Sequence, residues 1–179
     1  MKILAFDPSL SCTGWAMLRV HAEHPDGLIL GMGYIQPDGA PCDDLAARIL
    51  DLANGIGKRA AESAADLIVI ETPAKTGRAA GGQSFRGTAM TIPIYGAAVG
   101  ACITVCGREG VKVRGVPSDE WTKGRGVPSS RGDALKTRRV EYVCRQWGVK
   151  SLGPKTYAGN VADAVLIARW AMWRDWGVA

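Results

Sequence analysis

Residues 2–16 read KILAFDPSLSCTGWA, and this stretch decides how the chain folds. Residues 2–6 form an almost wholly apolar run, which predicts a strand buried in the middle of a sheet. Asp7 ends the run, and a short turn containing Pro, Ser, Thr and Gly leads to a second predicted strand at 14–20. Because a buried strand has no structural need of a terminal carboxylate, Asp7 is a candidate for chemistry.

Apolar periodicity predicts the remaining elements. A loop holding HPDG leads to a third strand at 28–35, so the first three strands are expected to form an antiparallel meander. Asp43 or Asp44 is expected to cap a helix whose apolar residues recur every three or four positions from 45 to 56. The run LIVIE at 67–71 predicts a fourth strand, which also ends on a carboxylate, Glu71. Further elements are expected at 91–106 (helix), 111–116 (strand), 133–147 (helix) and 157–176 (helix).

The predicted order of elements, β-β-β-α-β-α-β-α-α, is typical of the α/β class. It indicates a mixed five-stranded sheet whose first three strands are antiparallel, with helices on both faces. The chain has 179 residues, of which 47% are apolar and 22% charged, and it contains no repeat or low-complexity tract. We therefore expect one folded domain spanning residues 1–179.

The sequence also bears on where the protein works. No run approaches the roughly 18 uninterrupted apolar residues of a membrane span, and the first residues lead into a strand without the pattern of a signal peptide. The five cysteines are odd in number and form no CxxC pair, so they indicate neither a disulfide framework nor a zinc site. We expect a cytoplasmic protein with no membrane association.

Positive charge is concentrated in one part of the chain. The net charge is +5, and residues 111–145 carry nine Lys or Arg against four Asp or Glu, which equals the whole excess. A localised basic excess is typical of proteins that meet polyanions such as nucleic acids, although solvated basic surfaces are also common.

Three acidic residues are candidates for a shared metal site. Asp7 and Glu71 each end an apolar strand, and open α/β sheets bind their ligands at these carboxyl ends. In GNVADAVLIARW the last helix offers Asp163, with Asn160 three residues before it on the same helix face. If the three acids meet, their like charges need bound cations or shared protons, and oxygen ligands of this kind favour Mg²⁺.

The segments FDPSLSCTGWA, IVIETP and NVADAVLIA, in this order, resemble the three acidic motifs of the RuvC family of Holliday junction resolvases, within the ribonuclease H-like superfamily. The resemblance covers almost the whole chain, with 64 residues from Asp7 to Glu71 and 92 from Glu71 to Asp163. It implies a ribonuclease H-like fold in a variant of phage or prophage type, working in a bacterial cell or a phage-infected host.

The resemblance also implies an activity, that of a crossover junction endodeoxyribonuclease. Such an enzyme is a homodimer that nicks two strands of like polarity symmetrically across a four-way DNA junction, and it uses no nucleotide cofactor. Two Mg²⁺ ions per active site, with Mn²⁺ able to substitute, would prepare a water for attack and stabilise the departing 3′ oxygen. Asp7 would bridge both ions, and Glu71 and Asp163 would each complete one shell, with Asp163 near the attacking water.

The chain departs from the family pattern in three places, the third of which is the basic Gly-rich loop, whose phosphate contacts do not align uniquely. Asn160 stands where the family usually carries a fourth acidic or histidine ligand, and its amide oxygen can ligate a cation but brings no charge. The family's aromatic wedge follows the acid of the fourth strand, where this chain has Thr72 and Pro73, and Phe85 is the candidate to replace it. The candidate contacts to DNA phosphates are basic residues of the two Gly-rich loops and the helix that follows, namely Lys75, Arg78, Arg86, Lys123, Arg125, Arg131 and Lys136.

Three alternatives remain open. A YqgF-type nuclease acting on structured RNA also opens on an aspartate strand, but those chains are shorter and lack the late ADA helix. The actin and sugar-kinase ATPases share an Asp followed by small residues and Thr-Gly, but they need two lobes and a much longer chain. The third alternative is a junction-binding protein without catalysis, in which Asn160 leaves the site unable to hold metal.

Overall fold

The computed structural model describes residues 1–37, 44–73, 91–108, 110–124, 126–128 and 133–176. The strands are β1 (Lys2–Asp7), β2 (Thr13–His21), β3 (His24–Ile35), β4 (Leu67–Thr72) and β5 (Lys112–Pro117). The helices are α1 (Leu45–Ser63), α2 (Thr91–Gly107), α3 (Ser118–Trp121), α4 (Asp133–Trp147) and α5 (Lys155–Trp176). Each element expected from the sequence is present, and α3 is an additional short helix.

The five strands form one sheet in the order β3-β2-β1-β4-β5. β2 pairs antiparallel with both β1 and β3, whereas β4 runs parallel to β1 and β5 runs parallel to β4. The prediction of a mixed five-stranded sheet with its first three strands antiparallel is confirmed. Because β1 and β4 are parallel neighbours, their carboxyl ends lie at the same edge of the sheet.

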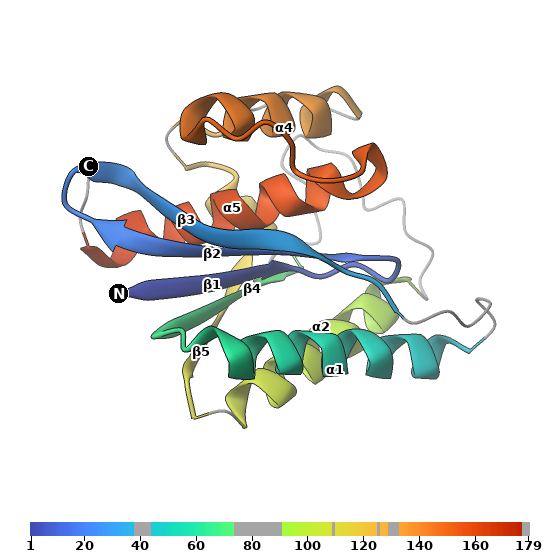
Figure 1. Ribbon diagram of the computed structural model, residues 1–179. Helices are drawn as coiled ribbons and strands as arrows, with labels where there is room; N and C mark the ends of the chain where they lie inside the picture. The colour runs from blue at the N-terminus through green and yellow to red at the C-terminus, as the bar shows by residue number, and fades with distance from the viewer. Residues whose placement is uncertain (38–43, 74–90, 109, 125, 129–132, 177–179) are drawn as a thin grey trace.

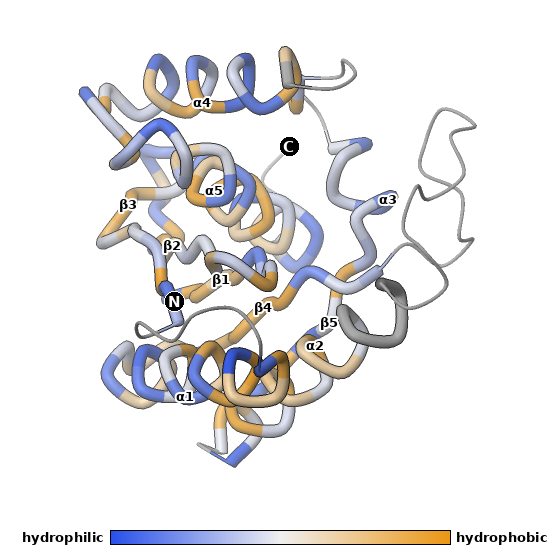
Figure 2. The backbone as a smooth tube through the Cα atoms, turned by 90° about the vertical axis from the view of Figure 1, so that its right-hand side faces the viewer, coloured by the Kyte–Doolittle hydropathy of each residue, from blue (hydrophilic) through white to orange (hydrophobic). Residues whose placement is uncertain are grey.

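Helices cover both faces of the sheet (Figure 1). α1 and α2 lie on one face, α5 packs on the other, and α4 packs on the outer side of α5. Figure 2 shows the same layers after a turn of 90°, with the apolar stretches of β1 and β4 between the helices. In the part of the chain that the structure describes, no helix is long and apolar enough to cross a membrane.

The core divides into two parts because successive side chains of a strand point to opposite faces of the sheet. On β1, Ile3 and Ala5 pack in the cluster that contains α5, and on β4 Leu67 and Val69 do the same. The residues between them, such as Phe6, belong to the cluster that contains α1 and α2. Odd-numbered residues of β1 and β4 therefore face α5.

Two segments differ from the expectation. The HPDG segment is not a loop, because β3 begins at His24 directly after a tight turn. Pro25 is tolerated there because β3 is an edge strand, where a missing N–H leaves no partner unpaired, and Gly27 supplies a positive φ of 77°. The last helix begins at Lys155, two residues earlier than expected.

Candidate active site

Asp7 and Glu71 end two neighbouring parallel strands, β1 and β4. The register pairs Phe6 with Ile70, so each acid is the next residue on its own strand. Both acids are odd-numbered and therefore belong to the set that faces α5. Their carboxyl groups lie at the carboxyl edge of the sheet, within hydrogen-bonding reach of each other.

α5 brings Asp163 and Asn160 to the same edge. Asp163 is 6% exposed and Asn160 is 8% exposed, which matches the 8% of Asp7. The close approach of α5 to β2 depends on Gly14, because a Cβ at that position would lie 2.1 Å from the carbonyl oxygen of Asn160. The fold thus assembles the four predicted site residues from β1, β4 and α5.

Burial and like charge raise the pKa of Asp7 well above its ordinary value. Burial is the largest cause, followed by the charge of Glu71, a hydrogen bond with Glu71 and the charge of Asp163, whereas the ammonium of Lys136 acts in the opposite direction. A proton shared between the carboxyl groups or a bound cation would relieve this repulsion. The edge of the sheet therefore gathers acidic groups whose ionised forms the fold does not fully compensate.

Asp163 is a second acid with a raised pKa, at about 6. Burial is the largest cause and the charge of Glu71 adds to it, whereas Arg139 of α4 lowers the pKa through its charge and a hydrogen bond. Nη1 of Arg139 lies 2.9 Å from Oδ1 of Asp163, and both side chains are buried. The acid cluster therefore contains a cation supplied by the chain itself.

Trp121, the last residue of α3, connects Arg139 to the other side of the cluster. The guanidinium carbon of Arg139 lies 4.7 Å from the centroid of the Trp121 ring, and the indole N–H donates to Oε1 of Glu71 at 3.2 Å. Contacts therefore run from Glu71 through Trp121 and Arg139 to Asp163. Sequence reasoning misses Trp121 and Arg139, although Arg139 lies four residues before the buried Val143, a spacing that indicates the inner face of a helix.

Asn160 is engaged at both ends of its amide. Its Nδ2 donates to the carbonyl oxygen of Cys12 at 3.0 Å and to Oγ of Ser9 at 3.4 Å. Its Oδ1 accepts a hydrogen bond from Nζ of Lys136 at 3.0 Å. Asn160 therefore ties the turn after Asp7 to α5 and holds the Lys136 ammonium beside the acids.

The chemistry of the donor set fits a hard divalent cation, because three carboxyl groups and an amide oxygen lie at one edge of the sheet. The raised pKa values of Asp7 and Asp163 mark negative charge that a cation would neutralise. Within the described residues, however, no group of three or more His, Cys, Asp or Glu side chains is placed so that it could hold a metal ion. The acids are thus a partly compensated cluster, with Asp163 paired to Arg139, rather than a closed ligand shell.

Most of the predicted DNA contacts lie outside the described residues, namely Lys75, Arg78, Phe85, Arg86, Arg125 and Arg131. Lys123 is exposed in the turn after α3. Lys136 lies on α4 with its ammonium at the Asn160 amide, so this predicted contact stands directly at the acid cluster.

The sheet order and the layers define a ribonuclease H-like α/β fold, with an acidic cluster where β1 and β4 end. The chain is similar to Thermus thermophilus RuvC in complex with a Holliday junction substrate, at 16% identity and a TM-score of 0.70, over 100% of this chain and 98% of that one. A second Thermus thermophilus RuvC structure gives 18% identity and a TM-score of 0.68, with coverage of 100% and 98%. Fowlpox virus resolvase with its Holliday junction DNA gives 9% identity and a TM-score of 0.59, with coverage of 97% and 98%.

No protein-family model matches the chain, and no curated protein matches it either. At these identities the likeness to the solved structures is one of fold. The resemblance to RuvC predicted from the three acidic motifs is therefore confirmed at the level of the architecture.

Proposed function

We propose that the protein is a metal-dependent, structure-selective endodeoxyribonuclease that resolves four-way junctions and other branched DNA. The observation that carries the proposal is the cluster formed by the buried Asp7 and Asp163 with the part-buried Glu71, in which burial and neighbouring carboxylates raise the pKa of Asp7 and Asp163. The fold supports branched DNA as the substrate, because two structures with the same architecture are complexes with Holliday junctions.

The site residues have distinct proposed roles. Asp7, Glu71 and Asp163 would hold two Mg²⁺ ions, and Asn160 would contribute an uncharged oxygen. When bound, the ions would lower the pKa of a water and neutralise charge on the departing 3′ oxygen. Lys136 stands beside the acids, where its ammonium is suited to a contact with the scissile phosphate.

Action as a crossover junction endodeoxyribonuclease requires two equivalent cuts. A four-way junction has approximate twofold symmetry, so a homodimer related by a twofold axis would present one acid cluster to each of two strands of like polarity. Such a dimer would make symmetric nicks. α2 carries no charged residue along its 17 residues, which makes it the candidate helix for contact between the two copies.

A junction-binding protein without catalysis is the second candidate function, and one observation favours it. Arg139 pairs with Asp163, and Lys136 pairs with Asn160, so cations of the chain itself engage two of the four predicted metal ligands. If a metal ion displaces neither Arg139 from Asp163 nor Lys136 from Asn160, the acids have only a structural role. The protein then binds junctions without cutting them.

Cleavage of a labelled synthetic four-way junction in Mg²⁺ tests the proposal, with linear duplex, flap DNA and structured RNA as comparison substrates. We expect paired nicks in the junction. Asp7→Asn should lower the rate at least about 100-fold while the protein still binds the junction, because several kcal/mol of transition-state stabilisation are lost. Asp51→Asn, on α1, is the matched control and should cut normally.

Each alternative gives a different result in the same assay. Preferred cutting of structured RNA would identify a nuclease of the YqgF type. Junction binding without cutting in either Mg²⁺ or Mn²⁺ would identify the non-catalytic protein. Full activity of Asp7→Asn would refute the assignment of the metal site.

A further inference from the structure

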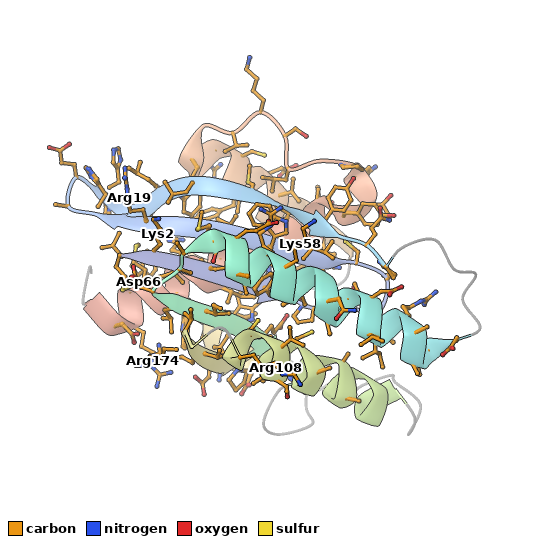
Figure 3. The ribbon with its side chains drawn as sticks, turned by 60° about the horizontal axis from the view of Figure 1, so that its bottom comes forward. Lys2, Arg19, Lys58, Asp66, Arg108 and Arg174 are labelled. Atoms are coloured by element: carbon orange, nitrogen blue, oxygen red, sulfur yellow. The ribbon has the colours of Figure 1, made fainter. Side chains whose placement is uncertain are left out.

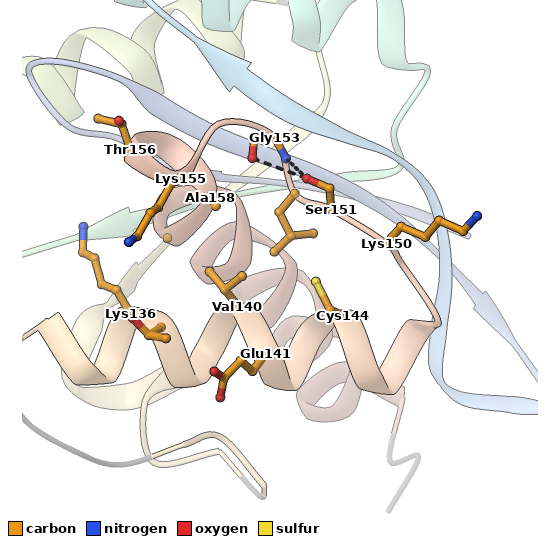
Figure 4. A pocket seen from close by; sticks show the side chains of 13 residues that line it. Lys136, Val140, Glu141, Cys144, Lys150, Ser151, Gly153, Lys155, Thr156 and Ala158 are labelled. Atoms are coloured by element: carbon orange, nitrogen blue, oxygen red, sulfur yellow. Dashed lines mark hydrogen bonds between the residues drawn. The ribbon is translucent and has the colours of Figure 1, made fainter.

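A groove lies between α4 and the first turns of α5, next to the acid cluster (Figure 4). Its volume is about 420 Å³. Val140 and Cys144 of α4 line its middle, and three lysines surround it. Lys136 and Lys155 stand at one end, and Lys150 stands at the other.

The groove is positively charged. Glu141 is the one acidic residue among the described residues that line it. Neither Lys150 nor Lys155 forms an ion pair with any residue that the structure describes.

The start of α5 adds to this charge. α5 begins at Lys155 and has no acidic residue in its first turn. The N-terminus of a helix carries partial positive charge, which an acid stabilises and a lysine does not. Two sources of like charge therefore meet at one end of the groove, an arrangement that is unfavourable for folding and that a bound polyanion relieves.

Lys136 joins the groove to the acid cluster. Its ammonium donates to Oδ1 of Asn160, while its side chain lines the groove. Gly159 leaves room for the aliphatic stem of Lys136, because a Cβ at that position would lie 2.9 Å from Cδ of the lysine. A DNA strand with one phosphate at the acids would therefore have a continuous cationic path into the groove.

We propose that the groove binds the sugar-phosphate backbone of the DNA strand next to the cleaved phosphodiester, with Lys150 and Lys155 contacting its phosphates. The inference rests on the proposed function and adds a second DNA-binding site to it. The chemistry fits a backbone, because lysines face phosphates, hydroxyls of Ser151 and Thr156 offer hydrogen bonds, and the apolar middle accommodates a sugar. Contacts of this kind set position and affinity but do not read sequence.

The salt dependence of junction binding tests the groove. The probe is a labelled synthetic four-way junction, and every protein carries Asp7→Asn so that binding is measured without cutting. The logarithm of the association constant falls linearly with the logarithm of the salt concentration, and each phosphate contact contributes about 0.9 to the steepness of that slope. We expect Lys150→Ala/Lys155→Ala to reduce the steepness of that slope by about 1.8 and Lys150→Arg/Lys155→Arg to preserve it.

Lys58→Ala/Arg108→Ala is the matched control, because it removes two exposed cations on the α1–α2 side of the sheet (Figure 3). The control should keep the slope of the parent. An unchanged slope for Lys150→Ala/Lys155→Ala, or an equal reduction in the control, overturns the proposal that the groove binds the DNA backbone. Neither result bears against the proposed nuclease function. If the Asp7→Asn parent shows no preference for the junction over linear duplex, the proposed function fails, and the groove fails with it.

Discussion

Arg139 is the cation that pairs directly with one of the clustered acids, Asp163. It pairs with Asp163 at 2.9 Å and stacks on Trp121, and its Nε has no hydrogen-bond partner among the described residues. A buried ion pair of this kind adds little net stability, but removal of one partner leaves an uncompensated charge. Arg139 therefore acts mainly by fixing Asp163 in place.

Arg139→Gln should destabilise the protein by about 3 kcal/mol at pH 8, because the carboxylate of Asp163 would be buried without its partner. The loss should be smaller at pH 5. There Asp163, whose pKa is about 6 with Arg139 present, takes up a proton and becomes neutral. Urea unfolding at the two pH values measures the difference. An equal loss at both pH values would contradict the proposed charge pairing.

Asp7→Asn should stabilise the metal-free protein, and by more at pH 7 than at pH 4. An acid whose pKa is raised by folding stabilises the fold at low pH and loses that contribution as the pH rises toward its folded value. The gain at pH 7 is expected to be on the order of 1 kcal/mol. Thermal unfolding in EDTA at both pH values measures this gain in stability. A gain that does not vary with pH would show that folding does not raise the pKa of Asp7.

At the scale of elements, the site depends on how closely α5 lies to β2. Gly14 permits the contact, because any side chain there would collide with the backbone of Asn160. The strand register then places Asp7 and Glu71 side by side. α5 supplies Asp163 from the face of the sheet on which it packs. The acid cluster is thus a consequence of one parallel strand pair and one close helix–strand contact.

Gly14→Ala should cost about 1–3 kcal/mol of stability, as overpacked sites do, and should also displace α5 and with it Asp163. Gly57→Ala is the control, because its Cβ would lie 2.1 Å from Cγ1 of Val105, between α1 and α2 and away from the acids. Melting curves with and without Mn²⁺ separate the two variants. Stabilisation by Mn²⁺ should be lost only in Gly14→Ala, and equal stabilisation of both variants would count against the role of this contact.

Several elements can be predicted from the sequence because their signals are local. The apolar runs mark β1 and β4, and a carboxylate at the end of each run marks Asp7 and Glu71. Arg139 and Trp121 cannot be predicted in this way, because their contact exists only after α3 and α4 pack beside the sheet. The start of β3 is missed for a related reason, since Pro25 reads as a loop residue unless its strand is known to lie at an edge.

At the scale of the whole molecule, the far end of α5 is held by a second buried arginine. Nε of Arg169 lies 2.6 Å from Oδ1 of Asp26, and its Nη1 donates to the hydroxyl of Tyr142 at 2.6 Å. Its guanidinium also lies 3.8 Å from the centroid of the Trp173 ring. These contacts join β3, α4 and α5, so α5 is anchored at the end away from the acid cluster.

Arg169→Gln should cost about 2 kcal/mol, somewhat less than Arg139→Gln, because the arginine of this ion pair is buried but the carboxylate of Asp26 is only partly buried. Unlike Arg139→Gln, it should leave the stabilisation by Mn²⁺ and the rate of junction cutting unchanged below its melting temperature. Parallel measurements on the two variants test this contrast. Equal damage to the metal response would show that general loosening of α5, and not the charge of Arg139, governs the site.

A crystal structure of the protein soaked with Mn²⁺ would decide whether the three acids act together. Anomalous scattering locates the ion without assumptions about the surrounding residues. We expect a peak in contact with Asp7, Glu71 and Asp163 at the carboxyl edge of β1 and β4. Mn²⁺ bound elsewhere, with Asp163 paired only to Arg139, would contradict a shared metal site and with it the proposed nuclease.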